Sequence, residues 1–474
     1  MKKIKNIHFV GVKGVGMAPL AIIAKEAGFT VSGCDIDQEF ITDAPLQKAG
    51  IISMVGFHED HIKDCDLVIT TGAHGGFDNV EVIAAKQQGI PVWTQGEAVG
   101  KFMNGEIFKR SFDTVSVAGC HGKTTTTAMI ATILKENKLD PSFLIGTGSI
   151  PSLGSCGHFG KGNHFVAEAD EYATEPKYDK KPKFLWQKPR IGLITNIEFD
   201  HPDLYPSMDS IREAFLAFAN NIQENGVLVA CLDDPETAKV IKNFKKKVVT
   251  YGFSKNADFY IDKVSMEPDR IFFWVHSENA ILGEFLLNVT GEHNALNALA
   301  AIIVCLELGL SLENIKKGLL GFKGTKRRME YIGVLSSGAV LYDDYAHHPT
   351  EIRKTLETLK KVHMNKKVVC IFQPHTYSRT KSLFEQFINS FNAADEVILV
   401  DIFPSARESI DSTVSSKLLA DMISRIHKNV ICIPELKDVV KYVDQKAFGR
   451  DYILVTMGAG NVYEISKEFI KQHE

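Results

Sequence analysis

A short polar segment between two apolar runs has the residue types that nucleotide chemistry needs. The segment consists of Gly119, Cys120, His121, Gly122, Lys123, Thr124 and Thr125. The apolar runs, residues 115–118 and 128–131, predict a strand before it and a helix after it. Glycines let backbone N–H groups turn inward around an anion, and a helix N-terminus adds its dipole. In such a loop Lys123 reaches terminal phosphates and the Thr124 hydroxyl binds Mg²⁺, so the segment predicts a phosphate-binding loop.

This loop is a shortened variant of the general pattern. Val117 stands at the position, five residues before Gly122, where that pattern has a glycine. A bare Gly-Lys-Thr sequence also occurs in ordinary turns. The strand before the loop and the helix after it favour nucleotide binding over that alternative.

Two later apolar runs, residues 164–167 and 190–196, each end in charged side chains. These are Glu168, Asp170 and Glu171 after the first run, and Glu198, Asp200 and His201 after the second. A single charge after a strand is common and carries little information. Because the carboxyl ends of parallel strands meet at the ligand-binding edge of a sheet, two such clusters predict a shared Mg²⁺–nucleotide site.

The N-terminal segment has a second glycine-rich turn. Gly11, Gly14 and Gly16 follow the apolar run 7–10 and precede a helical pattern, and Asp35 ends the next apolar run. This order predicts a Rossmann-type β-α-β unit. Its GxxGxG spacing differs from GxGxxG, which weakens a nicotinamide interpretation and allows other phosphate ligands.

We expect an α/β protein of three domains to position these residues. The domains are a Rossmann-like N-terminal domain over residues 1–107, a P-loop ATPase-like central domain over residues 108–322, and a Rossmann-like C-terminal domain over residues 323–474. In the last of these, apolar runs at residues 340–342, 368–372, 397–400 and 452–456 alternate with helical patterns.

Two further features of the central domain have open interpretations. Asn294 and Asn297 lie three residues apart on one face of a predicted helix, where paired amides can read a purine edge or merely cap the helix. The segment 172–189 is rich in Lys, Pro and aromatic residues and predicts a long loop with about one helical turn. That loop is either a solvated excursion or a rim that contacts an acidic substrate.

The composition is that of an ordinary globular protein. Of 474 residues, 45% are hydrophobic and 24% charged, and the net charge of −4 argues against a nucleic-acid surface. The eight cysteines are scattered singly, as expected of reduced thiols. We see no signal segment and no apolar helix long enough for a bilayer. We therefore expect a cytoplasmic protein, a monomer or weak homodimer, with no membrane or nucleic-acid partner.

Taken as a set, the motifs resemble those of the ATP-dependent Mur ligases of peptidoglycan synthesis, nearly from end to end. The matching segments are residues 119–127, 168–171, 200–201, 293–297, 343–351 and 372–380. The resemblance implies that the N-terminal domain binds a UDP-sugar, the central domain binds MgATP, and the C-terminal domain contributes ribose and amino-acid contacts. It implies an amide ligation, in which ATP phosphorylates the lactyl carboxylate of UDP-N-acetylmuramate and an amine then attacks the acyl phosphate.

The resemblance also implies roles for individual residues. The catalytic candidates are Lys123, Glu168, His201, His348 and Arg379, and the metal-binding candidates are Thr124, Glu168 and His201. Besides residues 119–125 of the loop, the nucleotide-binding candidates are His293, Asn294, Asn297, Arg327 and Asp344. The other substrate-binding candidates are Gly11, Gly14, Val15, Gly16, Asp35 and His375.

Departures from the family pattern bear on the acceptor. Cys120 replaces the usual Thr of the loop, where only the backbone is needed. Thr376 stands where some alanine-adding members have Arg, which leaves Arg379 as the main carboxylate anchor. Phe215 replaces the carbamylated Lys of several sister ligases, as in the branch that adds L-alanine. The long segment after Glu168 instead resembles the recycling branch, which adds an L-Ala-γ-D-Glu-diaminopimelate tripeptide.

L-alanine is accordingly the expected acceptor and the tripeptide the alternative. Two other classes of protein fit less of the chain. A nicotinamide oxidoreductase leaves the phosphate loop unexplained, and a non-catalytic nucleotide-binding regulator does not need Glu168, His201 and Arg379 together.

Overall fold

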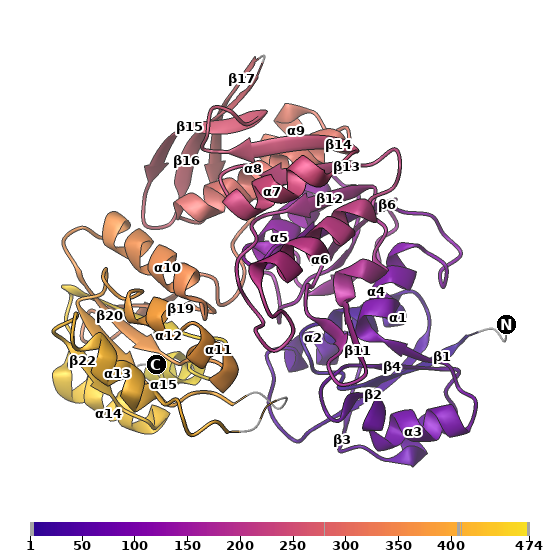
Figure 1. Ribbon diagram of the computed structural model, residues 1–474, viewed down its shortest axis with the longest axis horizontal. Coiled ribbons are helices and arrows are strands. Elements are labelled where there is room, and N and C mark those ends of the chain that lie inside the picture. Colours follow the sequence, from indigo (N-terminus) through magenta and orange to yellow (C-terminus); the bar gives the residue numbers. More distant parts are fainter. Residues whose placement is uncertain (1–3, 279, 405–407, 409, 472–474) are drawn as a thin grey trace. The chain divides into compact units, whose positions relative to one another are not determined.

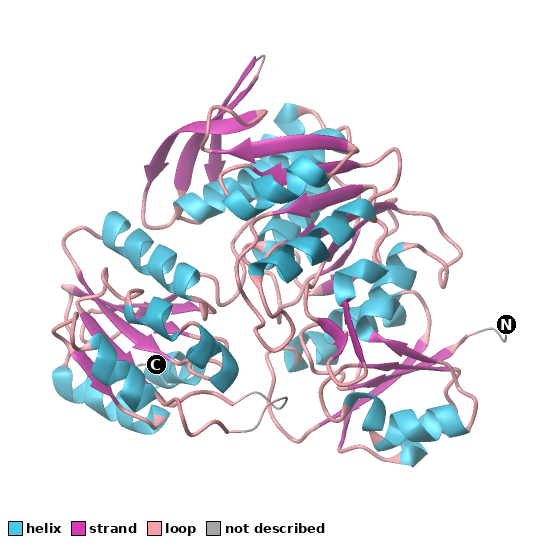
Figure 2. Ribbon diagram, viewed as in Figure 1, coloured by secondary structure: helices cyan, strands magenta, loops and turns pink. Residues whose placement is uncertain are grey.

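The computed structural model describes residues 4–278, 280–404, 408 and 410–471 (Figures 1 and 2). Residues 1–3 of the predicted N-terminal domain and residues 472–474 of the predicted C-terminal domain lie outside this range. The chain forms two compact units. One comprises Met1–Ser265, Ile271–Asn288 and Asn294–Lys326, and the other comprises Met266–Arg270, Val289–His293 and Arg327–Glu474.

The N-terminal part of the first unit is built on a five-stranded parallel sheet in the order β3-β2-β1-β4-β5. Its strands are β1 (Asn6–Val10), β2 (Thr30–Asp35), β3 (Ser53–Val55), β4 (Leu67–Thr70) and β5 (Val92–Thr94). Its helices are α1 (Ala18–Glu26), α2 (Asp43–Lys48), α3 (Val80–Gln87) and α4 (Gln95–Met103), with 3₁₀ turns η1 (Glu59–Ile62) and η2 (Gly76–Asp78). The inner strands β1 and β4 are almost wholly buried, as expected of a sheet covered on both faces.

The central part contains a ten-stranded sheet in the order β17-β16-β15-β14-β13-β12-β6-β9-β7-β8. Its strands are β6 (Asp113–Ala118), β7 (Ser142–Leu144), β8 (Gly157–His158), β9 (His164–Glu168), β12 (Ile191–Ile194), β13 (Val227–Cys231), β14 (Lys247–Gly252), β15 (Phe259–Met266), β16 (Ile271–Ser277) and β17 (Ala280–Leu287). Its helices are α5 (Lys123–Glu136), α6 (Met208–Asn220), α7 (Pro235–Asn243), α8 (Glu292–Glu307) and α9 (Leu312–Leu320). Strand β6 pairs in parallel with β9 on one side and β12 on the other. The three carboxyl ends that carry the sequence motifs therefore lie side by side.

The segment 172–189 is folded, which corrects the expectation of a long loop. It forms the antiparallel hairpin of β10 (Ala173–Glu175) and β11 (Asp179–Pro182), followed by η3 (Lys183–Trp186). Lys177 Nζ and the Tyr178 hydroxyl bond the two oxygens of Asp78 in η2, at 2.6 and 2.7 Å. The hairpin thus joins the central part to the N-terminal part instead of extending into solvent.

The second unit is built on a six-stranded sheet in the order β18-β19-β23-β20-β21-β22. Its strands are β18 (Glu330–Val334), β19 (Val340–Asp344), β20 (Lys367–Phe372), β21 (Glu396–Leu399), β22 (Val430–Cys432) and β23 (Tyr452–Met457). Its helices are α10 (Pro349–Val362), α11 (Tyr377–Ser382), α12 (Phe384–Ile388), α13 (Ser416–Ile423), α14 (Leu436–Lys446) and α15 (Tyr463–Lys471). Only β18 pairs antiparallel. The predicted α/β fold class is confirmed, with β19 extending two residues further than expected.

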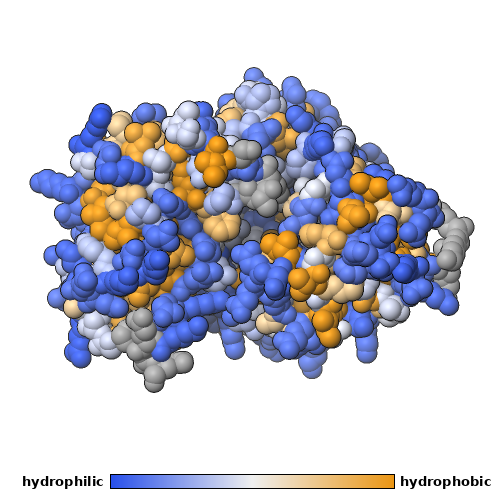
Figure 3. All heavy atoms as spheres, turned by 90° about the horizontal axis from the view of Figure 1, so that it is seen from below, coloured by the Kyte–Doolittle hydropathy of each residue, from blue (hydrophilic) through white to orange (hydrophobic). Residues whose placement is uncertain are grey.

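On the face shown in Figure 3, hydrophobic residues form separate patches among hydrophilic ones. Among the described residues, no helix combines the length and the hydropathy that crossing a membrane requires. The apolar helix α8 is covered by its own domain instead, and residues 298–304 are all at most 1% exposed.

Arg327 connects separate segments of the second unit through buried hydrogen bonds. Its Nε donates to Asp343 Oδ2 at 2.9 Å, and its terminal nitrogens donate to the carbonyls of Gly458 and Gly460 at 2.6 and 3.2 Å. The Arg327 and Asp343 side chains are only 9% and 3% exposed. The nucleotide contact that the resemblance implied for Arg327 remains a prediction. In the structure the guanidinium joins β19 to the segment after β23.

We predict that Arg327→Ala destabilises the second unit by about 3–5 kcal/mol, because the change leaves the Asp343 carboxylate buried without its cation. Arg328→Ala is the matched control. Its partly exposed side chain lies 3.4 Å from Glu351, and we expect a loss of at most about 1 kcal/mol.

Urea unfolding followed by two probes tests this prediction. The three tryptophans, Trp93, Trp186 and Trp274, all lie in the first unit, so their fluorescence reports that unit alone. Far-UV circular dichroism should show a transition shifted to lower urea in Arg327→Ala while the fluorescence midpoint stays unchanged. An unshifted dichroism curve would contradict the assignment.

Candidate active site

The phosphate loop joins β6 to α5, as the sequence predicted. At both of its glycines the neighbouring atoms leave no room for a side chain. Gly119 and Gly122 have φ of +132° and +83°, in the region that favours glycine. A Cβ on Gly119 would lie 2.0 Å from Thr195 Oγ1, and one on Gly122 would lie 2.5 Å from Asn297 Oδ1. The loop is therefore closely enclosed by the ends of β12 and α8.

Asn196, two residues after the end of β12, fixes the loop backbone. Its carbonyl accepts from the Cys120 N–H at 3.1 Å, and its Oδ1 accepts from the His121 N–H at 2.9 Å. Its Nδ2 donates to the His121 carbonyl at 3.0 Å, where the Thr195 hydroxyl also donates. Sequence reasoning missed both residues. Their only signal was a polar Thr-Asn pair at the end of a buried strand.

Lys123 opens α5 and forms an ion pair with Glu171. Its Nζ lies 2.8 and 3.1 Å from the two carboxylate oxygens and 3.3 Å from the Cys120 carbonyl. Burial alone would lower the pKa of Lys123, but the Glu171 carboxylate outweighs it and holds that pKa above its usual value. A permanent cation therefore sits at the mouth of the loop, where phosphate oxygens need compensating charge.

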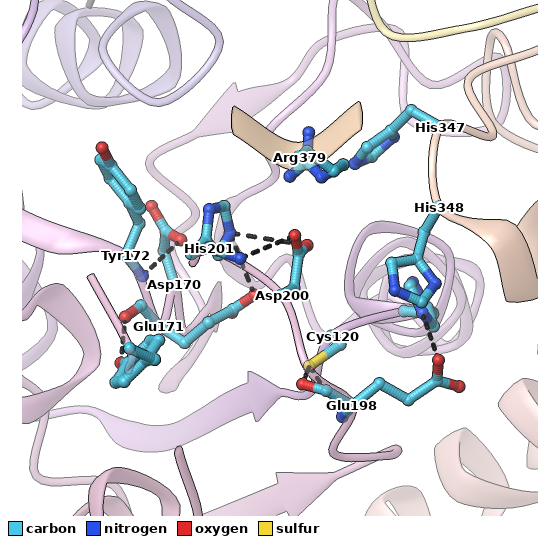
Figure 4. A network of polar contacts seen from close by, with 12 residues as sticks. Cys120, Asp170, Glu171, Tyr172, Glu198, Asp200, His201, His347, His348 and Arg379 are labelled. Atoms are coloured by element: carbon cyan, nitrogen blue, oxygen red, sulfur yellow. Dashed lines mark hydrogen bonds and ion pairs between the residues drawn. The ribbon is translucent and has the colours of Figure 1, made fainter. Parts of the chain in front are cut away.

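His201 approaches the same carboxylate from the segment after β12 (Figure 4). Its Nε2 lies 3.7 Å from Glu171 Oε1 and 3.7 Å from Asp200 Oδ2, and its N–H donates to Asp200 Oδ1 at 2.8 Å. The His201 backbone adopts φ of +55°, which is uncommon outside glycine. Lys123, Glu171 and His201 are thus brought together, as the strand-end clusters predicted.

Glu168 ends β9 opposite Val117 of β6, and its Oε1 accepts from the Gly146 N–H at 2.6 Å. Thr124 and Thr125 lie in the first turn of α5 and are 7% and 6% exposed. Thr124 and Glu168 offer the hydroxyl and carboxylate oxygens that Mg²⁺ prefers. The residues present therefore fit a magnesium ion.

The two asparagines predicted for the adenine side share one face of α8. Asn297 Nδ2 lies 3.5 Å from Asn294 Oδ1, and Asn297 also borders Gly122 of the phosphate loop. Both side chains are buried. His293 lies beside them in the first turn of the helix. The pair is therefore placed by packing next to the loop and is not a surface cap.

In the N-terminal part, the glycine turn is fastened to the end of β2. The N–H groups of Gly11 and Val12 donate to the Cys34 carbonyl at 2.9 and 3.0 Å, and Lys13 N–H donates to Asp35 Oδ2 at 2.8 Å. Asp35 is 1% exposed. Asp35 therefore stabilises the backbone of the turn. Its contact with a substrate remains a prediction.

The remaining residues of that turn differ in exposure. The Gly16 carbonyl accepts from Gln95 Nε2 at 3.2 Å, and Val15 is 39% exposed. Gly14 accepts through its carbonyl from the Met17 N–H at 2.8 Å, which starts α1. Their predicted contacts with a substrate remain predictions.

In the second unit, Arg379 and His375 are brought together at the start of α11. Arg379 Nη1 lies 3.3 Å from His375 Nδ1, and the Arg379 N–H donates to Thr376 Oγ1 at 3.3 Å. His348 caps α10, where its Nδ1 accepts from the Thr350 N–H at 3.3 Å. These contacts orient the side chains of His348, His375 and Arg379. Their contacts with a substrate remain predictions.

Asp344 is buried at the end of β19. It accepts from the Thr355 hydroxyl at 2.8 Å and from the Ala346 N–H at 2.9 Å. Burial raises the pKa of Asp344 to about 6. The carboxylate is thus less stable in its ionised form than an exposed aspartate.

Three family models match successive parts of the chain. The Mur ligase family catalytic domain matches residues 6–106, the Mur ligase middle domain matches residues 117–305, and the Mur ligase glutamate ligase domain matches residues 327–460. UDP-N-acetylmuramate–L-alanine ligase from Desulfitobacterium hafniense is 38% identical over 98% of this chain and 99% of its own length. Its counterpart from Caldanaerobacter subterraneus is 39% identical over 100% and 99%.

The chain belongs to the Mur ligase family. Among solved structures, UDP-N-acetylmuramate–alanine ligase from Thermotoga maritima is similar with a TM-score of 0.81 and 29% identity, covering 99% of both chains. A murein peptide ligase from Psychrobacter arcticus shares the fold, with a TM-score of 0.72 and 24% identity over 98% of both chains. Membership of the Mur ligase family makes this an ATP-using ligase, in agreement with the phosphate loop.

As in the Mur ligase motif, the loop presents its backbone, and the Cys120 side chain points elsewhere. Cys120 Sγ accepts from the Glu198 N–H at 3.2 Å and lies 3.3 Å from the Glu198 carbonyl. Burial raises the pKa of the Cys120 thiol, so it stays protonated. The replacement of Thr by Cys is therefore compatible with the loop geometry.

We predict that Asn196→Ala weakens ATP binding by roughly tenfold to thirtyfold. The change removes two side-chain hydrogen bonds to His121, each of which contributes about 1 kcal/mol to the loop conformation. Calorimetric titration with ATP measures the effect. Asn243→Ala is the control, because its amide donates to the Lys239 carbonyl within α7. Equal affinities for wild type and Asn196→Ala would show that the loop needs no such support.

Proposed function

We propose that this Mur ligase joins L-alanine to the lactyl carboxylate of UDP-N-acetylmuramate, with ATP converted to ADP and phosphate. The observation that carries the proposal is the 38–39% identity, over nearly the full length of both partners, to relatives named UDP-N-acetylmuramate–L-alanine ligase. The N-terminal glycine turn would hold the UDP-sugar and the central loop would hold ATP. The division into domains at residues 107 and 322 belongs to this proposal, as do the cytoplasmic location and the monomeric or weakly dimeric state.

In this mechanism Lys123 compensates charge during phosphoryl transfer. A carboxylate that attacks the terminal phosphate is repelled by negative charge, so a fixed cation at the loop lowers the barrier. Glu171 holds the Lys123 ammonium 2.8 Å away and keeps it protonated. The loop N–H groups, positioned by Asn196, would bind the phosphate oxygens.

Thr124 and Glu168 would hold Mg²⁺ with the phosphates, and His201 would hold a second metal near the sugar carboxylate. Magnesium would neutralise charge that develops on the phosphate oxygens. His201 is suited to its role because Asp200 and Glu171 flank its Nε2. Asn294 and Asn297 would contact adenine, with His293 beside them and Asp344 at the ribose.

Arg379 would anchor the carboxylate of the incoming amino acid, with His375 and His348 nearby in the same unit. An arginine fork matches a carboxylate through two parallel hydrogen bonds. The guanidinium is oriented by its contact with His375 and by the short helix α11. It is 6% exposed, which would strengthen an ion pair with a carboxylate ligand.

The tripeptide-adding reaction is the alternative, and its main sequence signal has another explanation. The long segment after Glu168 folds into the β10–β11 hairpin, whose residues Lys177 and Tyr178 are engaged by Asp78. Its basic and aromatic side chains are thus used within the protein. The length of this segment therefore does not favour a peptide acceptor.

An acceptor screen tests the proposed function. Phosphate release should require ATP, UDP-N-acetylmuramate and L-alanine together, and L-Ala-γ-D-Glu-diaminopimelate should not replace L-alanine. Lys123→Ala should slow this release by on the order of 10²-fold or more, since one fixed charge beside the phosphoryl group is lost. Lys135→Ala, at the other end of α5, is the control and should retain full activity. Activity with the tripeptide but not L-alanine would overturn the choice of acceptor and leave the ligase chemistry intact.

We predict that Arg379→Lys raises the KM for L-alanine at least tenfold and leaves the KM for ATP nearly unchanged. Lysine keeps the charge but loses the bidentate geometry, so ground-state binding of the amino acid is what is lost. Steady-state kinetics with each substrate varied in turn measures the two constants. Lys381→Ala, an exposed neighbour on α11 that pairs with Asp411, serves as the control. A matching rise in the KM for ATP would place Arg379 at the nucleotide instead.

A further inference from the structure

A compact group of metal-ligating side chains lies in the N-terminal part, apart from the residues of the proposed reaction. The N-terminal cluster consists of His8 on β1, Cys34 on β2, His61 on η1 and Glu81 on α3. His8, Cys34 and Glu81 are all 0% exposed, and the His61 side chain is 19% exposed. Three of the four side chains are thus fully buried, and His61 is the one nearest to solvent.

Glu81 is the meeting point of the cluster. Its Oε2 lies 3.0 Å from His8 Nε2 and 2.9 Å from Cys34 Sγ, and its Oε1 lies 2.6 Å from His61 Nδ1. The ligating atoms of His8, Cys34 and Glu81 all lie within 4.8 Å of one another. Three elements that are far apart in sequence, β1, β2 and α3, therefore direct imidazole nitrogen, thiol sulfur and carboxylate oxygen to one point, and His61 on η1 contacts the other oxygen of the same carboxylate.

These three donors, with His61 as the fourth, are the types and the number that zinc takes in proteins. Zn²⁺ binds sulfur at about 2.3 Å and nitrogen or oxygen at about 2.0–2.2 Å, so tetrahedral ligands lie about 3.3–3.7 Å apart. The observed separations around Glu81 are shorter by about 0.5 Å, a change that rotations of the side chains can supply. One thiolate and one carboxylate would balance the two positive charges of the ion within this buried site.

His8 is also fixed in the way that metal-binding histidines are fixed. His8 Nδ1 lies 2.9 Å from Ser32 Oγ, which leaves Nε2 directed at Glu81 and Cys34. Metal-binding histidines usually have their second nitrogen fixed in this manner. The backbone N–H of His58 donates to Glu81 Oε1 at 3.0 Å and orients the carboxylate in the same way.

We propose that the N-terminal cluster binds one divalent cation of the zinc type as a structural site. The Cys34 carbonyl accepts from the N–H groups of Gly11 and Val12, and the adjacent Asp35 accepts from Lys13. The ion would therefore fix the end of β2 and, through it, the glycine turn. This site uses softer ligands than the magnesium site proposed at Thr124 and Glu168, and it does not depend on the proposed reaction.

Cobalt(II) titration of the full-length, chelator-treated protein tests the proposal. A cysteine-ligated tetrahedral site gives a thiolate-to-metal charge-transfer band in the near ultraviolet together with visible d–d bands. We expect both to saturate at one equivalent of Co²⁺ and to disappear when excess Zn²⁺ displaces it. Zinc should also raise the unfolding temperature of the wild-type protein, since it binds the folded state.

Cys34→Ser is the decisive variant. A serine hydroxyl can still donate to Glu81, so the fold is kept while the thiolate is lost. We expect the charge-transfer band to vanish, the affinity to fall at least 100-fold and the zinc-induced rise in unfolding temperature to disappear. Cys65→Ser is the matched control, a nearby thiol outside the cluster, and should behave as wild type.

A second variant covers the case in which Cys34→Ser fails to fold. His61→Gln, at the exposed side, should keep the sulfur band and lower the affinity at least tenfold. The absence of the band from wild type, or its survival in Cys34→Ser, would overturn the proposal. Loss of the band in Cys120→Ser and not in Cys34→Ser would also overturn the proposal, because the ion would then lie at the phosphate loop.

Discussion

The parallel pairing of β6 with β12 is the constraint on which the active site depends. Ile194 of β12 pairs with Ala118 of β6, so the residues that follow each strand leave the sheet at the same level. Asn196 therefore reaches the backbone of Cys120 and His121, and the loop is held by a neighbour and not by its own sequence. A slip of this register would move Asn196 away from the loop.

The edge of this sheet at which the parallel strands end also explains how the charged residues are arranged. Strand β9 pairs with the other side of β6 and delivers Glu168 and, three residues later, Glu171. A lysine as buried as Lys123 would tend to lose its proton, and the Glu171 carboxylate prevents this. The ion pair thus keeps the loop cation charged, and in the proposed reaction phosphate oxygens would compete with Glu171 for a side chain that is already in place.

The sequence predicted those features that are encoded locally. The phosphate loop, the Rossmann-type opening and the strand ends with Glu171 and His201 could be read from short segments, since each depends on neighbouring residues. Asn196 was missed because its role depends on pairing with a strand over 70 residues away. The β10–β11 hairpin was predicted as a loop because its charged and aromatic residues look solvated until Asp78 is brought to them.

The antiparallel strands β16 and β17 gave no signal that sequence reasoning used, although Ile271, Phe273 and Val275 alternate in burial. The extra length of β19 was missed for a related reason. Asp343 and Asp344 are poor strand formers in isolation, but Asp343 pairs with Arg327 and accepts from the Thr456 hydroxyl. In both cases tertiary contacts override the local preference.

Buried carboxylates recur in this protein, and their partners decide their ionisation. Partial burial tends to raise the pKa of Asp170, but Lys183 and Lys123 outweigh it and hold that pKa well below its usual range. Burial likewise tends to raise the pKa of Glu81, but His8 and Cys34 lower it to about 2. Asp344 is the contrast, because burial dominates and raises its pKa from 3.8 to about 6.

A raised pKa means that the folded state binds the proton more tightly than the unfolded state. The resulting stability is present below pH 3.8 and is lost as pH rises to about 6, and the loss amounts to about 3 kcal/mol for Asp344. At neutral pH the second unit therefore carries an ionised carboxylate at a measurable cost in stability. Buried groups with such shifts concentrate at functional sites, and a ribose hydroxyl that donates to Asp344 would offset the cost. The raised pKa of Asp344 is thus compatible with the nucleotide role proposed for it, which remains a prediction.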